Sequence, residues 1–482
     1  MAVHRTVPAV LAAYACSACF SAMAEDPVES PSPSASAPAQ AEKSYAIPIV
    51  QIIGFDFLLN RYNRRFSGTS DYDVSWASIK RNLRGPWVED NDPFKVNQFA
   101  HPYQGSLYHG AGRASGLNYW EASALTFAGS AWWEITGEQT PPARNDQIAS
   151  GIAGSFFGEP LFRMAHLMLK NRSEVPYVWR QWGAAAISPP VGLNRLMFGE
   201  RFADSFSDHD PIYYGRLRIG ANHLVRNDSA AADDVKRNEA ELDFSLDYGL
   251  PGQPGYTYTR PFDYFSFQAV LSSANGVENL VSRGLLWGTD YALGNSYRGI
   301  WGLYANYDYL APQTFRVSTT ALSIGTTAQW WASQDVAVQG TALVGLGYSA
   351  ASASNAPSSD PSSGVVNDRD YHYGVAPRLG LAMRLIAGAQ AALDVNAQKY
   401  FLGRASNRSA GRDDISRVDA ALTWRIKGRH AVGLKYAWTH RNASFPSGGQ
   451  QVRTLGTVGL YYTLLGLDTF GTVDWREQQR EP

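Results

Sequence analysis

The chain has 482 residues and a formal net charge of −1 at pH 7. This even balance excludes the strongly basic surface of a typical nucleic-acid-binding protein, so we expect no nucleic-acid partner. Aromatic residues make up 13% of the chain and charged residues 18%. Because soluble proteins are about one quarter charged, the composition favours a β protein that contacts lipid.

The first 24 residues have the pattern of a secretory signal peptide. Arg5 supplies a positive charge, Val7 to Phe20 is apolar, and a small-x-small cleavage site ends at Ala24. We expect residues 1–24 to be removed by cleavage after Ala24. Residues 25–44 are rich in Pro, Ser and Ala, a composition that predicts a disordered linker.

Both cysteines of the chain, Cys16 and Cys19, lie inside the predicted signal peptide. Their C-x-x-C spacing is found in redox and metal sites, and lipidation of Cys19 is a further alternative. The preceding residues Cys16-Ser17-Ala18 fit a lipidation signal poorly. We therefore predict a mature chain without cysteine, which is common for proteins that cross the oxidising periplasm.

Residues 45–205 are predicted to form a mainly helical domain. Its first segment, Ala46 to Leu59, is apolar and fits either a strand or a docking helix, because Pro48 and Gly54 weaken both. Helical periodicity then appears in three segments, Gln98 to Arg113, Leu117 to Glu138 and Asp146 to Lys170.

The second of these segments combines an apolar helix with a narrow polar stripe. The apolar face consists of Trp120, Ala124, Phe127, Ala131 and Ile135, and the stripe of Tyr119, Ser123, Thr126, Ser130 and Glu134. Since this run is short for a bilayer span and includes Glu121, a buried core helix is expected.

The third segment has small residues at a spacing of four. Ser150, Gly154 and Gly158 fall in one row, which predicts close approach of a second helix. Asp146 follows Pro141-Pro142 and is predicted to be the N-cap of this helix.

Residues 101–159 resemble a family. The residues that carry the resemblance are His101, Pro102, Gln104, Gly105, Asn118, Glu121, Trp133 to Gly137, Asn145, Asp146 and Glu159. They are similar to the signature of an uncharacterised bacterial family of unknown function, in which such a helical segment is joined to a C-terminal outer-membrane barrel. This resemblance implies a location and an architecture, but no activity.

A second similarity, to VanZ-like membrane proteins, rests on Glu138, Gln139, Arg144, Asp146, Gly154 and Gly158. The sequence departs from that pattern at Ser150, where the family usually has Asn, and in the position of the glycines.

Five residues are candidates for acid–base chemistry: His101, Glu121, Glu134, Asp146 and Glu159. A carboxylate or imidazole buried on an apolar helix has a shifted pKa, which suits catalysis. The alternative is that each is paired with backbone or with Arg113, Arg144 or Arg163, and only holds helices together. We assign binding roles to Tyr103, Gln104, Asn118, Trp133, Glu138 and Asn145. No metal site and no cofactor is expected.

Residues 206–466 are predicted to form a transmembrane antiparallel β-barrel of about 12 strands. Apolar and polar side chains alternate along them, as in Val418 to Ile426 and Ala240 to Tyr248. The expected strands are 212–224, 237–249, 262–273, 278–291, 297–310, 315–331, 335–349, 371–386, 388–402, 415–427, 429–441 and 452–464. The charged face is expected to point inward, with Arg216 and Arg218 pairing with Glu241 and Asp243 across strands. The alternative fold is a soluble β-sandwich.

Connection lengths indicate an orientation for this barrel. Connections after the seventh, ninth and eleventh strands are expected to be long, and those after the sixth, eighth and tenth short. This alternation places both chain ends of the barrel in the periplasm. Leu250 to Arg260 is an exception, since it is long for a periplasmic turn.

The last expected strand, Thr457 to Leu464, resembles the signal read by the outer-membrane assembly machinery, which we expect to be a partner during biogenesis. Residues 467–482 are then a C-terminal tail, or include a further strand near Leu467 to Trp475.

The sequence therefore predicts an α+β protein of the bacterial outer membrane, with lipid as a partner. The first hypothesis is an envelope protein whose helical domain plugs or caps the barrel and binds a lipid, glycan or periplasmic partner. The second is an enzyme that modifies lipid or lipopolysaccharide with His101, Glu121 and Glu134 close together. The third is a narrow solute channel.

Overall fold

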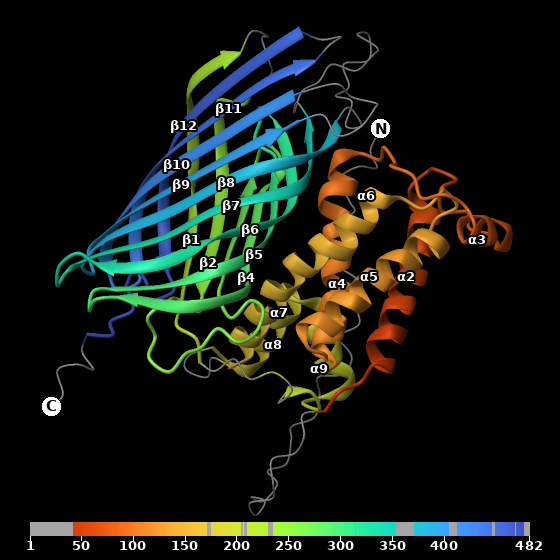
Figure 1. Ribbon diagram of the computed structural model, residues 1–482, viewed down its shortest axis with the longest axis horizontal. Helices are drawn as coiled ribbons and strands as arrows, with labels where there is room; N and C mark the ends of the chain where they lie inside the picture. Colours follow the sequence, from red (N-terminus) through yellow and green to blue (C-terminus); the bar gives the residue numbers. More distant parts are fainter. Residues whose placement is uncertain are drawn as a thin grey trace, which may run out of the picture. The chain divides into compact units, whose positions relative to one another are not determined.

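The computed structural model describes residues 42–170, 175–203, 206, 210–229, 235–313, 315–352, 371–403, 412–445, 449–467 and 469–476. The chain divides into a helical unit, Met1–Asn91 with Phe99–Ser207, and a barrel unit, Asp92–Gln98 with Asp208–Pro482 (Figure 1). The predicted signal peptide and the linker up to residue 41 lie outside the described residues.

The helical unit is built from short and medium helices. They are α2 (Ala46–Phe66), α3 (Trp76–Asn82), α4 (His101–Ala114), α5 (Tyr119–Thr136), α6 (Arg144–Asp146), α7 (Gly154–Lys170), α8 (Tyr177–Ile187) and α9 (Pro189–Phe198), with the π-helical turn η2 (Gln147–Ala153). A second π-helical turn, η1 (Val96–Ala100), begins in the barrel unit and ends in the helical unit. In the described part of the chain, no helix has the length and apolarity needed to cross a membrane.

Two local predictions are decided by these helices. The apolar segment from Ala46 is helical and continues through a basic end to Phe66. The N-cap prediction for Asp146 is wrong, because Asp146 has helical backbone angles and its side chain makes no capping hydrogen bond. Its carboxylate instead accepts a hydrogen bond from the neighbouring Asn145.

The close helix packing predicted from small residues is confirmed. A Cβ at Gly154 would lie 2.5 Å from the Cα of Gly105, and a Cβ at Gly105 would lie 1.8 Å from the carbonyl oxygen of Ser150. Helix α4 therefore crosses η2 and α7 with backbone against backbone. A second core forms where α4, α7, α8 and α9 meet, from Ala114, Phe162, Ala165, Ala184 and Val191.

The barrel unit is a closed antiparallel barrel, and the prediction of about 12 strands is confirmed. The strands are β1 (Tyr213–Ser229), β2 (Asn238–Tyr248), β3 (Phe265–Ser272), β4 (Gly276–Leu293), β5 (Tyr297–Leu310), β6 (Arg316–Trp331), β7 (Val336–Ser352), β8 (His372–Ala387), β9 (Ala391–Leu402), β10 (Arg412–Lys427), β11 (His430–Phe445) and β12 (Gly449–Leu465). Each strand pairs with its neighbours in sequence, and β1 pairs with β12 from Arg216↔Leu465 to Ser229↔Arg453.

The prediction of a long connection after the eleventh strand is wrong. Strand β11 ends at Phe445 and β12 begins at Gly449, so both strands are longer than expected. They continue through polar residues such as Asn442 and Gln450, where apolar alternation has ended but backbone pairing has not. The long connection after the second strand is confirmed, from Tyr248 to Phe265.

Side chains alternate between the lumen and the outer wall of the barrel. On β10 the inward Asp413 and Thr423 are buried, whereas the outward Leu422, Trp424 and Ile426 are 47%, 53% and 67% exposed. The same polarity holds on β6, β8, β11 and β12, where the outward exposed residues include Leu322, Ile324, Leu379, Leu381, Val432, Leu434 and Leu460. This barrel is therefore apolar outside and polar inside, the reverse of a soluble sandwich.

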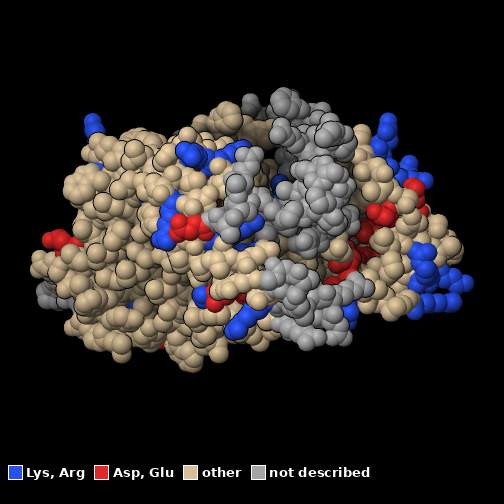
Figure 2. All heavy atoms as spheres, turned by 90° about the horizontal axis from the view of Figure 1, so that it is seen from above, with Lys and Arg blue, Asp and Glu red and all other residues tan. Residues whose placement is uncertain are grey.

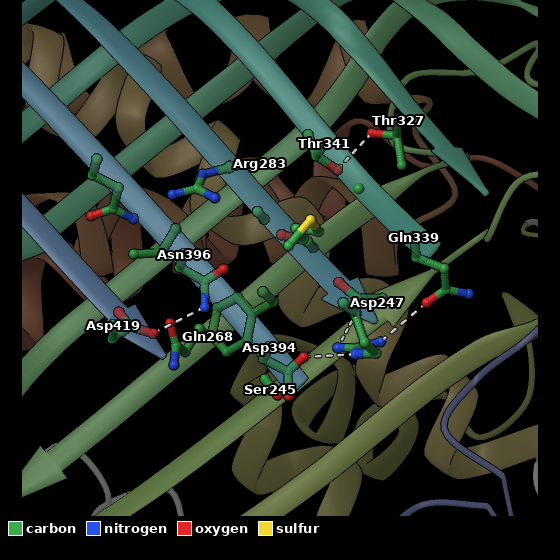
Figure 3. A pocket seen from close by; sticks show the side chains of 18 of the residues that line it. Ser245, Asp247, Gln268, Arg283, Thr327, Gln339, Thr341, Asp394, Asn396 and Asp419 are labelled. Atoms are coloured by element: carbon green, nitrogen blue, oxygen red, sulfur yellow. Dashed lines mark hydrogen bonds and ion pairs between the residues drawn. The ribbon is translucent and has the colours of Figure 1, made fainter. Parts of the chain in front are cut away.

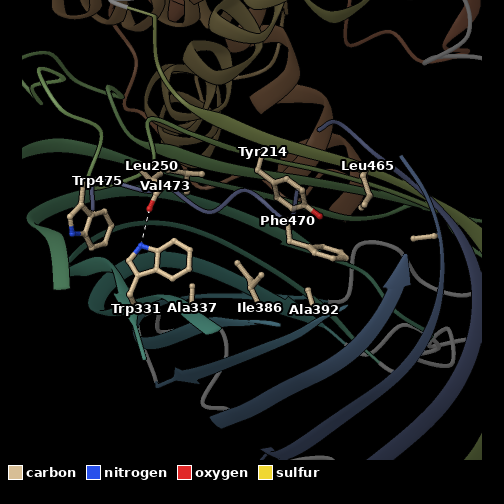
Figure 4. Packing of buried hydrophobic residues seen from close by; sticks show 11 residues of the cluster. Tyr214, Leu250, Trp331, Ala337, Ile386, Ala392, Leu465, Phe470, Val473 and Trp475 are labelled. Carbon is tan, nitrogen blue, oxygen red and sulfur yellow. Dashed lines mark hydrogen bonds between the residues drawn. The ribbon is translucent and has the colours of Figure 1, made fainter. Parts of the chain in front are cut away.

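The residues after β12 return to one mouth of the barrel (Figure 4). Phe470, Val473 and Trp475 are buried there among inward side chains that include Trp331 and Ile386. The described residues 469–476 form no strand, so the alternative of a further strand near Leu467 to Trp475 is wrong. The segment is held by side chains instead of by a sheet edge.

A short piece of chain from outside the barrel sequence also belongs to the barrel unit. Residues Asp92–Gln98 lie on the outer wall, where Phe94 is fully buried between Tyr309 and Tyr371, with ring centroids 6.1 and 5.3 Å away. The Tyr307 hydroxyl donates to the carbonyl oxygen of Gln98 at 2.6 Å. Tyr307 and Tyr309 point outward because they alternate with the lumenal Asp308 on β5.

Candidate functional site

His101 lies in a buried chain of polar groups in the helical unit. Its Nδ1 is 3.1 Å from Ser150 Oγ, and its Nε2 is 3.7 Å from Asp146 Oδ2. All three side chains are at most 5% exposed. Burial lowers the pKa of His101 to about 4, although Asp90 opposes this effect, so the imidazole is neutral at physiological pH.

Asn145 extends this polar chain to Asp90. The Asn145 amide donates to Asp146 at 2.9 Å and to the Asp90 carboxylate at 2.5 Å, and it accepts from the Asp90 backbone N–H at 3.0 Å. Two predicted catalytic residues, His101 and Asp146, are therefore brought together with one predicted binding residue, Asn145. The π-helical turns η1 and η2 end and begin beside them, and such turns are frequent at functional sites.

Glu159 forms a second, separate cluster. Its carboxylate accepts from Arg113 at 2.7 Å, from Arg163 at 2.8 Å and from His109 Nε2 at 3.0 Å. Burial alone raises the pKa of Glu159, but Arg113, His109 and Arg163 together hold it well below its usual value. Glu159 is fully buried. This ion-pair cluster matches the structural alternative, in which arginines satisfy the carboxylate and tie α4 to α7.

Gln104 belongs to a third group, which includes a carboxyl that the sequence analysis did not identify. Its amide donates to the Tyr108 hydroxyl at 2.5 Å, and Tyr108 donates to Asp56 Oδ1. Asp56 is 3% exposed, and burial raises its pKa to about 8 despite the hydrogen bonds from Tyr108 and Gln104. Asp56 is therefore mostly protonated at neutral pH.

The remaining candidates have local structural partners. Asn118 and Glu121 form the capping box of α5, and Glu121 also pairs with Lys43 at 3.1 Å. Glu134 accepts from the Ala143 backbone N–H at 2.9 Å. The Trp133 indole donates to Glu138 at 3.0 Å, and the ring of Tyr103 packs near Phe99 and Phe157.

His101, Glu121 and Glu134, which the enzyme hypothesis expects close together, have different hydrogen-bond partners. His101 is bonded to Ser150, Glu121 to the start of α5, and Glu134 to the backbone of the α5–α6 loop. The spacing of residues along one helix gives the face of each side chain, but it does not give the partner that the next helix supplies.

The barrel lumen contains a dense network of ion pairs. The Asp394 carboxylate on β9 forms ion pairs with three arginines. The N···O distances are 2.7 Å to Arg216, 2.7 Å to Arg384 and 3.1 Å to Arg218. Further pairs are Arg218–Asp243, Lys435–Glu241, Arg378–Asp308, Arg417–Asp419 and Arg441–Asp413. The predicted Arg218–Asp243 pair across β1 and β2 is confirmed. Arg216 instead pairs with Asp394 of β9, and Glu241 pairs with Lys435 of β11.

This network leaves a small polar cavity, of about 90 Å³. Asp247, Gln339 and Asp394 line it, projecting from β2, β7 and β9, and Figure 3 labels them around the cavity. The C-terminal segment lies across the mouth nearest to Gln339. Gln339 donates to the Gly471 carbonyl at 2.7 Å, and Gln329 donates to the Val473 carbonyl at 2.6 Å.

The surface of the helical unit has an inverted polarity that the sequence analysis did not anticipate. On α5 the polar Thr126, Ser130 and Glu134 are at most 2% exposed, whereas Trp120, Phe127 and Trp132 are 45–47% exposed. Helix α2 likewise exposes Ile49, Val50, Ile53, Phe57 and Leu58. The apolar face and narrow polar stripe of this helix are visible in the sequence. The prediction of a buried core helix assigns the apolar face to the inside, whereas the structure has the polar stripe inside.

Comparison with known proteins places part of the chain. Residues 86–190 match the family model described as a domain of unknown function, DUF3943. This range includes the residues that carry the first resemblance, and the prediction of similarity to an uncharacterised family is confirmed. No match was found among curated proteins.

Solved structures that resemble the chain are outer-membrane barrels. The NanC porin is 8% identical with a TM-score of 0.27, covering 51% of this chain and 98% of that one. The outer membrane channel DcaP of Acinetobacter baumannii is 11% identical with a TM-score of 0.25, covering 53% and 97%. OmpT, an outer membrane protein of Vibrio cholerae, is 10% identical with a TM-score of 0.20, covering 52% and 96%.

Proposed function

We propose that the chain is an outer-membrane protein whose barrel is a closed anchor and whose helical unit binds lipid. The observation that carries this proposal is the inverted polarity of α5, with Thr126 and Glu134 inside and Phe127 and Trp132 outside. In water such an arrangement exposes apolar area at a cost of about 25 cal/mol per Å². In contact with acyl chains the same face costs nothing. Within the buried stripe, Thr126 donates to the Ala122 carbonyl oxygen and Glu134 accepts from the Ala143 backbone N–H.

The outer wall of the barrel supports the membrane location. Its exposed side chains are aliphatic and aromatic over strands on most sides, whereas the charged residues face the lumen in pairs. A transmembrane barrel needs this distribution, because a charge facing the bilayer midplane costs about 2–4 kcal/mol. The turns between β6 and β7, β8 and β9, and β10 and β11 are short. From these turns we infer that the start of β1 and the end of β12 face the periplasm.

The lumen supports an anchor over a channel. Ion pairs cross it between strands that are not neighbours, such as Arg216 of β1 with Asp394 of β9. The C-terminal segment closes one mouth with hydrogen bonds from Gln329 and Gln339. The small polar cavity between these pairs has a volume of about 90 Å³, which is narrow for solute passage, and plugging or capping of the barrel by the helical unit stays a prediction.

Spin labelling tests lipid contact by the helical unit. In the mature chain folded into lipid nanodiscs, Phe127→Cys places a nitroxide on the outward face of α5, and Glu200→Cys places one on an exposed turn after α9. We expect the label at position 127 to be accessible to oxygen but shielded from a water-soluble nickel complex, and the label at position 200 to show the opposite. Equal access of the nickel complex to both positions would contradict the proposal.

Electrical recording tests the closed lumen separately. The full chain in planar bilayers is expected to show no regular conductance steps, because paired charges and the C-terminal segment obstruct the lumen. Regular, ion-selective steps of a size typical of porins would favour the solute channel instead.

A lipid-modifying enzyme remains the second candidate, for one specific reason. His101 lies between Ser150 and Asp146, and a hydroxyl, an imidazole and a carboxylate in series are the groups that acyl transfer requires. Labelling with a fluorophosphonate probe tests this candidate. Labelling that is lost in Ser150→Ala would favour the enzyme, whereas absence of labelling is expected if the cluster only joins α4 to η2.

A further inference from the structure

We infer that the end of α2 and the whole of α3 form a site for the phosphate groups of an anionic lipid layer. This inference rests on the proposed function and names the lipid chemistry that the helical unit recognises. The site, here called the basic rim, consists of Arg61, Arg64, Arg65, Lys80, Arg81 and Arg84. All six side chains belong to exposed residues.

The charge of the basic rim is local. Residues 60–88 contain these six cations and only two acids, Asp71 and Asp73, in a chain whose net charge is −1. Arg64 is paired with Asp73 at 2.7 Å, which leaves an excess of positive charge on the others. Figure 2 shows blue side chains gathered at the right-hand end, where Figure 1 places α3.

Exposed apolar side chains lie among these cations. Phe66, Trp76 and Leu83 are 54%, 80% and 64% exposed, and the guanidinium of Arg65 lies 5.5 Å from the Phe66 ring centroid. Aromatic residues next to Lys and Arg are typical of the membrane interface, where rings sit at the level of the headgroups and cations reach phosphate. Single-stranded nucleic acid is also bound by cations next to aromatic rings, but the aliphatic side chain of Leu83 and the apolar face of α2 offer no stacking surface for bases and fit acyl chains instead.

Helix α2 connects the basic rim to that apolar face. Ile49, Val50, Ile53 and Phe57 are exposed along its first turns, and the arginines follow from Arg61 onward. An apolar stretch followed by a basic end is the order expected when a helix passes from acyl chains to headgroups. The residue order therefore favours a lipid over free inorganic phosphate.

The basic rim is held in place by hydrogen bonds to neighbouring segments and by a helix cap. Asn82 on α3 donates to the carbonyl oxygens of Glu138 and Thr140 at 3.2 and 2.8 Å. Asn60 on α2 donates to the Gly137 carbonyl at 2.8 Å, and Ser75 and Ser78 form the capping box of α3. The cations are thus presented by fixed helices, which reduces the ordering cost of binding.

Titration of the full chain with soluble short-chain lipids tests the inference. The probes are short-chain phosphatidylglycerol, short-chain phosphatidylcholine and inorganic phosphate, each added to the detergent-solubilised protein. The variants are Arg61→Gln/Arg65→Gln and Lys80→Gln/Arg84→Gln. The matched control is Arg195→Gln/Arg201→Gln, which removes two charges elsewhere on the helical unit, where both arginines pair with Glu.

We expect tighter binding of phosphatidylglycerol than of phosphatidylcholine. Each rim variant should lose about thirtyfold in affinity, since each of its two cations near an anionic surface contributes roughly fivefold. The control should bind as the wild type does. Binding of phosphatidylglycerol that is unchanged in both rim variants would overturn the inference while the lipid-facing α5 stands. Equal affinity for inorganic phosphate would also overturn it, and the spin-label result at position 127 remains the separate test of the proposed function.

Discussion

Asp56 shows how a single buried carboxyl makes the stability of the helical unit depend on pH. Its folded pKa of about 8 lies above the ordinary value of 3.8, so the folded state binds a proton that the unfolded state releases. The stabilising effect of this proton is complete below pH 3.8 and is lost as pH rises through 8. Between these two values the free energy of unfolding falls by up to about 1.4 kcal/mol per pH unit.

We therefore predict that Asp56→Asn becomes increasingly more stable than the wild type as pH rises from about 4 to 8. Thermal unfolding of the detergent-solubilised chain, followed by circular dichroism in the helix band, measures the difference. A constant gap between the two melting temperatures across this range would show that Asp56 does not titrate as its burial implies.

Glu159 is the opposite case, a buried carboxylate kept ionised by its neighbours. Replacement by Gln leaves Arg113 and Arg163 buried with one anion fewer, and breaking a buried ion pair costs about 3–5 kcal/mol. We predict a loss of this size for Glu159→Gln in the same unfolding measurement. Glu200→Gln, which breaks the exposed pair with Arg195, should cost less than about 1 kcal/mol, and equal losses in the two variants would refute the structural role of the cluster.

At the scale of elements, the contact between α4 and η2 depends on the absence of a side chain. Gly105→Ala would place a Cβ 1.8 Å from the Ser150 carbonyl oxygen, so the helices must separate at a cost of about 3 kcal/mol. Gly54→Ala on α2 meets nothing within 4 Å and should instead stabilise by about 0.5–1 kcal/mol. Melting temperatures that shift in opposite directions would confirm the prediction, and a neutral Gly105→Ala would contradict it.

The elements that could be predicted are those whose pattern is local. Strand alternation gave twelve strands, since the two sides of a barrel wall impose period two on every strand. Small residues at a spacing of four gave the close packing at Gly154, because only backbone fits there. The sequence does not show which face of α5 points inward. The same arrangement of apolar and polar residues around the helix is expected for a core helix in water and for a lipid-facing helix.

The site residues were predictable only in part, for a similar reason. His101, Asp146 and Glu159 were identified because ionisable groups on apolar helices are costly without partners. The partners of His101 and Glu159, Ser150 and His109, come from other segments of the chain, and no local pattern distinguishes them. The seal formed by residues 469–476 was missed because irregular chain has no periodicity to detect.

For the whole molecule, the proposed orientation predicts which connections face the outside of the cell. A protease site inserted in the β7–β8 connection, residues 353–370, should be cleaved on intact cells, because this long connection lies at the end opposite to the barrel's chain ends. The same site inserted between β8 and β9, at residues 388–390, should be protected until the cells are opened. Cleavage of the second site alone on intact cells would show that the barrel has the opposite orientation.

The position of the seal in the sequence makes the wall and the seal separable. Phe470, Val473 and Trp475 follow β12 in the chain, and the described strand pairs of the barrel all lie before them. A late nonsense codon just after β12 is therefore expected to leave the barrel in the membrane and to raise the permeability of the cell envelope.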